Sequence, residues 1–294
     1  MKITLHLGAH KTGSTYVQAV LEQSMARLAA QGCTYVPLDT FRPAFTRRAY
    51  APSGAAPDPA AAEDYLRDVI AGAQGAHLLL SDENLLGTPR EVVETGALYP
   101  NMAGRLALIA DILRGHDLTL VLCIRRMSDF LRSIYTENLR ECPRNFTPVE
   151  TFRAAWTPSA CSWLPVVEGV RAAFPGAGLA LLNYKHFRDD PTDIIGQIAG
   201  WKLEDDAQPT HWSRRRGLSQ TATEVLLELG AREGGMAVRK ASHDVAQAHP
   251  VTADNWTYKM WSDAEVDAFQ TTFGADLKAL RNTPGIRMIR PASV

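Results

Sequence analysis

The sequence predicts an α/β fold with a doubly wound, mostly parallel β-sheet of about five strands flanked by helices. Apolar segments of strand length alternate five times with segments of helical periodicity, as expected of strand–helix–strand units. The strand segments are apolar throughout, which indicates strands buried on both faces. We expect residues 1–294 to form a single domain, in which residues 201–294 are a helical C-terminal extension.

The first half of the chain contains four of the predicted strands. Ile3 to Leu7 is an apolar run that leads into a glycine-containing turn, and apolar residues then recur at helical spacing from Val17 to Leu28. Residues 37–60 are rich in Pro, Ala and Arg without a clear period, so we expect a surface loop there. The same criteria predict strands 33–36, 77–80 and 118–124 and helices 61–73, 102–115 and 128–140.

The second half is predicted to be mostly helical. One apolar run, 179–183, predicts the fifth strand, and apolar periodicity predicts helices 162–174, 191–200, 219–232 and 262–281. Tryptophans fall in the less regular segments that would border a cleft, where an indole can pack in the core or stack on a sugar ring. These tryptophans are Trp156, Trp163, Trp256 and Trp261.

Composition excludes several classes of protein. Lys and Arg total 31 against 32 Asp and Glu, so bulk charge does not favour a nucleic-acid binder. The sequence has no apolar run of about 18 residues and no signal peptide at its start, so we expect no membrane association. The four cysteines form no CxxC pair and are typical of reduced thiols, which favours a cytoplasmic protein.

The turn after the first strand has the residues of an anion-binding loop. It reads Gly8-Ala9-His10-Lys11-Thr12-Gly13-Ser14-Thr15 and runs directly into the first helix. Backbone N–H groups and the helix dipole favour an anion at such a helix start, and the Ser14 and Thr15 hydroxyls can donate to phosphate oxygens. In a nucleoside-triphosphatase loop the lysine directly follows the second glycine. Here Lys11 precedes Gly13 by two residues, which indicates transfer of a different group.

A second anion site is predicted where strand 118–124 ends. Arg125 leaves the carboxyl end of that strand, the edge where open α/β sheets bind ligands. Asp129 and Ser133 follow at a four-residue spacing that places them on one helix face. A forked cation and a hydroxyl suit a phosphomonoester. In the alternative interpretation Arg125 is a surface charge and Ser128 or Asp129 caps the helix, and we expect Ser128 to be the cap in either case.

The two motifs together resemble the sulfotransferases that use 3′-phosphoadenosine 5′-phosphosulfate (PAPS), in particular the bacterial branch of that superfamily. In this family a Lys/Arg-Thr/Ser-Gly-Ser/Thr-Thr run follows the first strand, and an Arg ends a later strand with Ser eight residues on. His6, Gly8, His10 and Gln18 also match the pattern of the bacterial branch. The family often has Asn-Pro after the Arg, whereas Arg126-Met127 stands here.

The resemblance implies a P-loop-like fold and a set of cofactor-binding residues. It implies PAPS as the donor, 3′-phosphoadenosine 5′-phosphate (PAP) as the product and no required metal. Lys11, Thr12, Gly13, Ser14 and Thr15 would bind the 5′-phosphosulfate, and Arg125 and Ser133 the 3′-phosphate. Arg214 to Gly217 resembles the basic segment that closes over the cofactor, so Arg216 is a further candidate, although three arginines can equally form a solvated cluster.

Lys11, Glu83 and His10 are the candidate catalytic residues. We expect Lys11 to neutralise charge on the leaving oxygen. Glu83 follows strand 77–80 at the same sheet edge as the loop and is the first candidate for the base that deprotonates an acceptor hydroxyl. His10 is the second candidate, with an ordinary pKa near ~6.5, and can instead hold the loop's shape. Asp82 can cap a short helix that begins at Glu83.

The predicted activity is transfer of a sulfuryl group to a hydroxyl of a carbohydrate or another small metabolite. One alternative is a small-molecule or nucleoside kinase that uses ATP and Mg²⁺, with Leu78 to Asp82 as the strand that holds the metal. Another is a nucleotide-binding module without turnover, which would leave Glu83 and His10 without a role.

Overall fold

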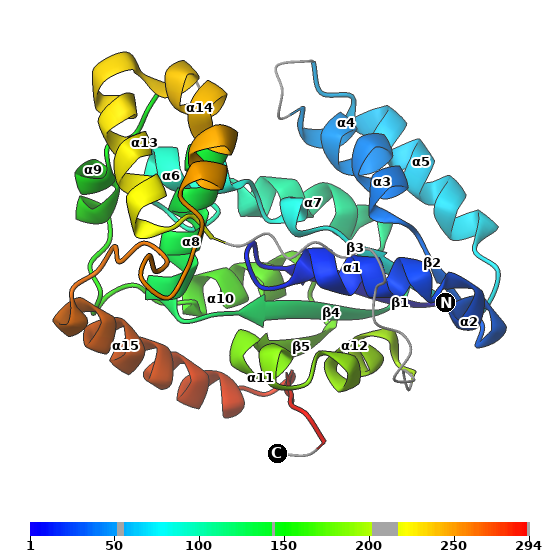
Figure 1. The fold of residues 1–294 in the computed structure, drawn as a ribbon. Helices are drawn as coiled ribbons and strands as arrows, with labels where there is room; N and C mark the ends of the chain where they lie inside the picture. The colour runs from blue at the N-terminus through cyan, green and yellow to red at the C-terminus, as the bar shows by residue number, and fades with distance from the viewer. Residues whose placement is uncertain (52–55, 143–144, 202–216, 293–294) are drawn as a thin grey trace.

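The computed structural model describes residues 1–51, 56–142, 145–201 and 217–292. In this part of the chain a six-stranded sheet has the order β2-β3-β1-β4-β5-β6, and every neighbouring pair of strands is parallel (Figure 1). The strands are β1 (Lys2–Gly8), β2 (Cys33–Tyr35), β3 (His77–Ser81), β4 (Asp117–Ile124), β5 (Gly178–Asn183) and β6 (Ile286–Ile289). The predicted α/β fold with a parallel sheet flanked by helices is confirmed.

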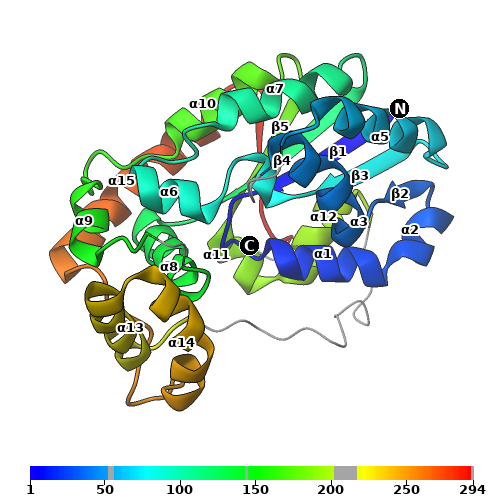
Figure 2. The same cartoon turned by 90° about the horizontal axis from the view of Figure 1, so that it is seen from above.

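Helices cover both faces of the sheet (Figures 1 and 2). On one face Leu21 of α1 and Ile194 of α12 join Val121 of β4 in an apolar cluster. On the other face Leu106 of α7 belongs to the larger cluster that contains Leu5 of β1. The helices are α1 (Ser14–Gln23), α2 (Met25–Ala30), α3 (Leu38–Phe41), the π-helical turn η1 (Arg42–Thr46), α4 (Arg47–Tyr50), α5 (Pro59–Gly72), the 3-10 turn η2 (Glu83–Leu85), α6 (Pro89–Thr95), α7 (Met102–Ile112), α8 (Met127–Arg140), α9 (Val149–Ala154), α10 (Leu164–Ala173), α11 (Tyr184–Asp189), α12 (Pro191–Ala199), α13 (Gln220–Glu233), α14 (Gly235–Ala248) and α15 (Asp263–Arg281).

The connections of the sheet diverge at the carboxyl ends of β1 and β4. These strands are neighbours, but the chain leaves β1 toward β2 on one side of the sheet and leaves β4 toward β5 on the other. Leu21 of α1 and Phe130 of α8 lie in the clusters on opposite faces of the sheet. Open α/β sheets bind ligands outside such a point of divergence. The loop after Gly8 and the Arg125 motif therefore lie side by side at this edge.

The sixth strand and the segment 38–50 differ from the sequence-based expectation. Strand β6 has only four residues and pairs with β5 at the sheet edge, and its Arg287 is exposed, so its apolar signal is weak. Residues 38–50 are not a surface loop: α3, η1 and α4 form a helical segment that buries Phe41 and Phe45 with their rings stacked 5.2 Å apart. The four-residue spacing of these aromatics is the helical signal, which the surrounding Pro, Ala and Arg obscured.

The chain after residue 217 forms helices that pack against the rest of the fold, as expected of a helical extension. Helix α14, which was not predicted, starts after Gly234 at φ 80° and pairs with α13. Both α14 and α15 contact α8, and α15 also contacts β6 (Figure 1). Among the helices in the described part of the chain, none is both long enough and apolar enough to cross a membrane.

Substitution of Asp276 tests whether the C-terminal helices unfold together with the sheet. Its carboxylate, 3% exposed on α15, accepts hydrogen bonds of 2.7 Å from Ser162 Oγ and from the Trp163 backbone N–H. Because Asp276→Ala leaves the buried Trp163 N–H without a partner and removes the hydrogen bond from the half-buried Ser162, it should lower the free energy of unfolding by about 2–3 kcal/mol. Urea denaturation measures this, with the exposed Asp267→Ala on the same helix as control. An unchanged midpoint, or two separate transitions, would contradict a single cooperative unit.

Candidate functional site

The loop between β1 and α1 is closed by its own side chains and leaves its next N–H groups available. Thr12 Oγ1 donates to the Ala9 carbonyl at 2.6 Å and accepts from the Ala9 N–H at 3.3 Å. In the described residues, the N–H groups of residues 11–15 donate no hydrogen bond, and the first N–H engaged in the turns of α1 is that of Tyr16. These five groups lie at the start of a ten-residue helix, where N–H groups and the dipole favour an anion.

Backbone conformation and close contacts explain the two glycines of this loop. Gly8, Lys11 and Gly13 have φ angles of 63°, 63° and 89°, in the left-handed region that favours glycine. A Cβ on Gly13 would collide with the Phe187 ring, and a Cβ on Gly8 would lie 3.2 Å from Cβ of Glu83. The loop backbone therefore approaches its neighbours closely, and Lys11 is the residue with a Cβ that this turn strains.

The second predicted motif contacts the first directly. Arg125 NH1 donates to the Lys11 carbonyl at 3.0 Å and to Ser133 Oγ at 3.3 Å. The Arg125 guanidinium also lies over the Tyr184 ring, 4.8 Å from its centroid, and Trp163 Nε1 donates to the Arg125 carbonyl at 2.7 Å. Burial lowers the pKa of Arg125 from its ordinary value, as expected of a cation whose charge is incompletely compensated. An anion bound here would compensate it.

The rest of the Arg125 motif is organised differently from the prediction. Asp129 does not turn toward Arg125: it pairs with Arg126 at 2.9 Å and with Arg132 at 3.2 Å. Ser128 does not cap the helix, because Arg126 occupies the N-cap position and Ser128 Oγ has no partner among the described residues. Asp129 therefore neutralises the two flanking arginines and leaves Arg125 and Ser133 facing the loop.

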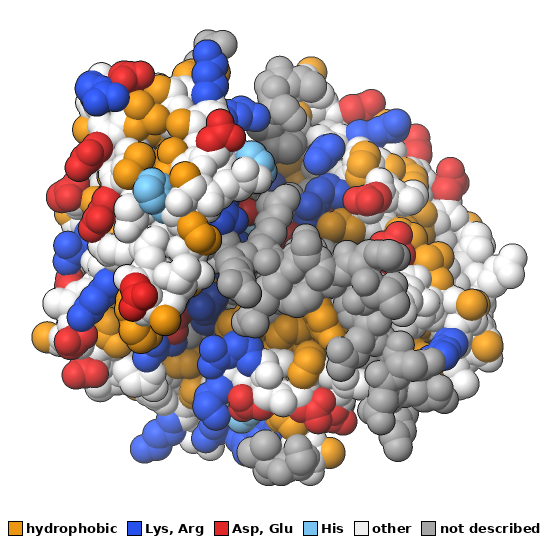
Figure 3. Space-filling view, viewed as in Figure 1, with side chains coloured by type: hydrophobic (Ala, Val, Ile, Leu, Met, Phe, Trp, Pro, Cys, Tyr) orange, Lys and Arg blue, Asp and Glu red, His pale blue; other side chains and the backbone are white. Residues whose placement is uncertain are grey.

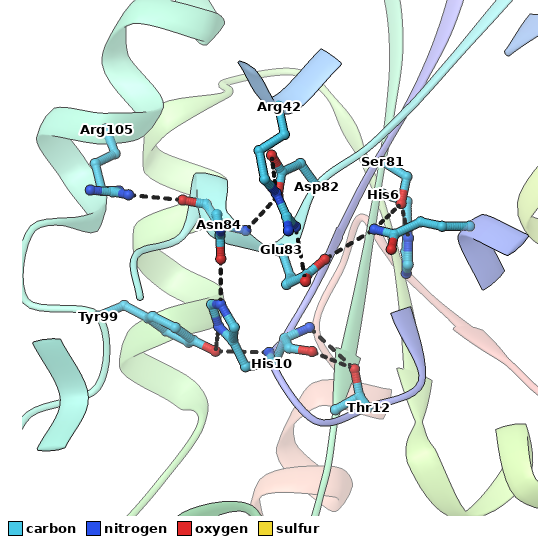
Figure 4. A network of polar contacts seen from close by, with 12 residues as sticks. His6, His10, Thr12, Arg42, Ser81, Asp82, Glu83, Asn84, Tyr99 and Arg105 are labelled. Carbon is cyan, nitrogen blue, oxygen red and sulfur yellow. Dashed lines mark hydrogen bonds and ion pairs between the residues drawn. The ribbon is translucent and has the colours of Figure 1, made fainter. Parts of the chain in front are cut away.

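Two carboxylates follow β3 and share one arginine (Figure 4). Arg42 binds the fully buried Asp82 through Nε and NH2, the shortest contact being 2.7 Å, and its NH2 reaches Glu83 Oε1 at 3.0 Å. Gln18 donates to the other Glu83 oxygen at 3.0 Å. Asp82 also accepts from the Asn84 N–H, so its predicted capping role is confirmed. These contacts hold Glu83 beside Gly8 as an ionised carboxylate.

The same network holds the side chain of His10, a residue of the loop after β1 (Figure 4). Its Nε2 lies 2.8 Å from Asn84 Oδ1 and its Nδ1 lies 3.2 Å from the Tyr99 hydroxyl, which also accepts the His10 backbone N–H at 3.1 Å. Arg105 completes the chain by donating to the Asn84 carbonyl at 3.0 Å. Both ring nitrogens of His10 are thus engaged within the protein, which supports its expected role in holding the loop.

Burial and charge set the protonation of these groups. Burial lowers the pKa of His6, under the loop, to about 4, and it also lowers the pKa of His10. For Glu83 burial by itself raises the pKa, but the positive charge of Arg42 together with hydrogen bonds such as that from Gln18 holds the pKa of this carboxyl below its usual range. At neutral pH the imidazoles of His6 and His10 are therefore neutral and the Glu83 carboxyl is ionised.

The predicted site residues meet in one region. Lys11 to Thr15, Arg125 and Ser133 lie together at the ends of β1 and β4, and Glu83 and His10 lie on the β3 side of the loop. Figure 3 shows Lys and Arg side chains on both sides of the hollow between the α13–α14 pair and α3 to α5. Arg216, with Arg214 and Arg215, lies outside the described residues.

Several residues of the site were not assigned a role from the sequence. Arg42 belongs to the segment predicted as a loop, and Tyr99 and Asn84 reach His10 from elements distant in the chain. Gln18 belongs to the family pattern, but its contact with Glu83 depends on tertiary structure. Glu137, one helical turn after Ser133, accepts from Lys11 Nζ at 3.2 Å. Spacing on one helix face is the only signal that links it to the motif.

Comparisons with known proteins give a limited result. No protein-family model matches the chain, and no curated protein matches it. Among solved structures, a sulfotransferase from Alicyclobacillus acidocaldarius is similar with 15% sequence identity and a TM-score of 0.38, over 81% of this chain and 94% of that chain. At this level of similarity, function has to be inferred from the site itself.

The buried histidines predict a loss of stability in mild acid. His6 has a pKa of about 4 in the folded protein against 6.5 ordinarily, so between these values the unfolded state binds more protons and stability falls as the pH is lowered. His6 alone accounts for about 3 kcal/mol over this range. His10 acts in the same direction, and Glu83, with its lowered pKa, adds a further loss below its ordinary value of 4.5.

Denaturation in urea between pH 4 and 7 measures this loss. His6→Gln should flatten the pH dependence, because glutamine does not titrate, whereas His243→Gln at an exposed position should leave the dependence unchanged. A free energy of unfolding that stays constant from pH 6.5 to 4 would contradict the buried, neutral state of these rings.

Proposed function

We propose that this protein is a sulfotransferase that transfers the sulfuryl group of PAPS to a hydroxyl. The observation that carries the proposal is the direct bond between two anion-binding elements. Arg125 joins the Lys11 carbonyl to Ser133, so a loop whose N–H groups at residues 11–15 bind no other described residue lies in contact with a forked cation and a hydroxyl. A nucleotide with phosphates at both its 5′ and 3′ positions fits this pair of positions better than a simple 5′-triphosphate.

The residues present suit the donor. The N–H groups of residues 11–15 and the Ser14 and Thr15 hydroxyls would hold the 5′-phosphosulfate. Arg125 and Ser133 would hold the 3′-phosphate, which would compensate the buried charge of Arg125. Arg216 remains a candidate by resemblance only. The bound donor would supply the sulfuryl group, and the chain would supply position, charge and a base.

Lys11 and Glu83 have separate roles in the proposed transfer. The acceptor oxygen forms a bond to sulfur as the bond from sulfur to the phosphate oxygen breaks, giving the sulfate ester, PAP and one proton. Lys11 neutralises the charge that develops on the phosphate oxygen, assisted by the loop N–H groups. Glu83 accepts the hydroxyl proton. By analogy with phosphoryl transfer, the proton leaves late in a loose transition state, so a carboxylate with a lowered pKa is still adequate.

The contacts of Glu83 and His10 favour Glu83 as the base. Glu83 is ionised and its side chain is 12% exposed, so a proton can reach it. His10 is buried, and its ring nitrogens are held by Asn84 and Tyr99. We therefore assign His10 to the shape of the loop. Arg42 and Gln18 position Glu83.

The kinase alternative is less well supported by the same residues. Asp82, the carboxylate that would hold Mg²⁺ after β3, is fully buried and bound by Arg42 and by the Asn84 N–H. Lys11 precedes Gly13 and pairs with Glu137, unlike the lysine that follows the second glycine in a triphosphatase loop. A pure binding module would not need an ionised, arginine-held carboxylate beside the loop.

A carbohydrate or another small metabolite is the proposed acceptor. Of the tryptophans expected near the cleft, Trp156, Trp163 and Trp261 are buried, so their role is packing. Trp256 is 73% exposed and is the one of the four that can stack on a sugar ring. No nucleic acid or membrane enters this proposal.

A mass-spectrometric acceptor screen tests the proposal. The protein is incubated with PAPS and a panel of saccharides and small alcohols, without ATP or Mg²⁺. A product heavier by one sulfuryl group, absent with Lys11→Ala, is expected. Phosphorylation that requires ATP and Mg²⁺ would instead establish a kinase, and binding of PAP without any product across a broad panel would favour a binding module.

Arg125→Ala should weaken the binding of PAP far more than the binding of AMP, which lacks the 3′-phosphate. Loss of the bidentate cation removes about 2 kcal/mol or more, roughly 30-fold in the dissociation constant of PAP. Isothermal titration calorimetry with PAP and with AMP measures the difference. Arg132→Ala serves as the control, because Arg132 pairs with Asp129 and not with the loop. An equal loss for both nucleotides would show that Arg125 does not bind the 3′-phosphate.

Glu83→Gln should lower kcat for sulfuryl transfer about 100-fold while the dissociation constant of PAP stays within roughly 2-fold. Glutamine keeps the shape and the contact with Arg42 but cannot accept the proton. Single-turnover kinetics with PAPS, together with PAP calorimetry, separate the two quantities. A variant that binds PAP poorly but turns over normally would place the base elsewhere.

A further inference from the structure

The ion pair between Lys11 and Glu137 lies at the centre of the proposed transfer site. Lys11 Nζ and Glu137 Oε2 are 3.2 Å apart, and Arg140 NH1 lies 4.0 Å from the same oxygen. The Lys11 and Glu137 side chains are only 28% and 17% exposed. A pair that is partly removed from water is screened less and coupled more strongly than a pair at the surface.

Helix α8 holds Lys11 at both its backbone and its side chain. Ser133 and Glu137 are one helical turn apart and share a face of α8. Ser133 contacts Arg125, which binds the Lys11 carbonyl, and Glu137 binds the Lys11 ammonium. These contacts stabilise the left-handed conformation of Lys11, at φ 63°, which a residue with a Cβ ordinarily avoids. The lysine is thus fixed by the helix that also carries the proposed 3′-phosphate contact.

We infer that Glu137 is a positioning residue that pairs with Lys11 and is exchanged for the donor's phosphosulfate when the nucleotide binds. The inference rests on the proposed function, because it takes Lys11 as the residue that neutralises the leaving phosphate. Every anion that reaches Lys11 has to compete with a carboxylate that is already in place. A small monoanion gains little from the exchange, whereas a polyanion also gains the loop N–H groups. Glu137 thereby restricts Lys11 to polyanionic ligands.

Removal of the competing charge should tighten anion binding, and only through Lys11. Glu137→Gln is expected to lower the dissociation constants of PAP and of inorganic pyrophosphate roughly 5-fold, the order of magnitude of a partly buried ion pair. In a Lys11→Ala background the same substitution should have no effect on either ligand. A purely structural role of Glu137 would weaken binding instead, so the direction of the change separates the two.

Isothermal titration calorimetry of the full chain measures the dissociation constants of PAP and pyrophosphate in a double-mutant cycle. Four proteins are compared: wild type, Glu137→Gln, Lys11→Ala and the double variant. Glu141→Gln is the matched control, because it removes the same charge from an exposed position just after the end of α8. Its dissociation constants should equal those of the wild type. In assays with PAPS, the KM for PAPS of Glu137→Gln should fall without a rise in kcat.

The two ligands distinguish failure of this inference from failure of the proposed function. If the wild type binds pyrophosphate but not PAP, the sulfotransferase proposal fails, and the exchange is still measured with pyrophosphate. The inference is overturned if Glu137→Gln binds pyrophosphate no more tightly than the wild type, or if the gain persists in Lys11→Ala. The inference is also overturned if neither the wild type nor Glu137→Gln binds PAP or pyrophosphate.

Discussion

The hydrogen bond from Arg125 to the Lys11 carbonyl fixes how the ends of β1 and β4 meet. Parallel pairing brings these ends to one edge, and the contact of Arg125 with Lys11 then holds the loop after β1 against the end of β4. Arg125 makes this contact as a partly buried cation that also donates to Ser133 and packs on Tyr184. The strained loop and the start of α8 thereby form one rigid unit. A ligand that spans both meets a preorganised site, which lowers the entropic cost of binding.

A second set of contacts determines the charge and protonation of the side chains beside the loop. Arg42 neutralises the buried Asp82 and keeps Glu83 ionised, and the His10 ring is neutral between Asn84 and Tyr99. Burying so many polar groups is costly unless each is paired, so the network stabilises the fold only in this one arrangement. The same pairing leaves the ammonium of Lys11 and the carboxylate of Glu83 as the cation and the base of the proposed transfer.

Features of the site that depend on short stretches of the chain could be predicted from the sequence. The strand-to-helix turn and the spacing of Arg125 and Ser133 predicted two anion sites, and the parallel sheet predicted that they would share an edge. Contacts between distant segments could not be predicted in the same way. Arg42 reaches Asp82 from a segment whose aromatic spacing is masked by Pro and Ala, and four-residue β6 is too short for a clear strand signal. The prediction that Ser128 caps α8 was wrong, because the N-cap is Arg126, two residues earlier in the chain.

A crystal structure of the protein with bound PAP is the most direct measurement. The account requires one phosphate of a single nucleotide on the N–H groups between His10 and Tyr16, and the other phosphate on Arg125 and Ser133. A nucleotide bound elsewhere, with the glycine turn empty of phosphate, would contradict it. So would ATP with a metal ion in that turn at the expense of PAP.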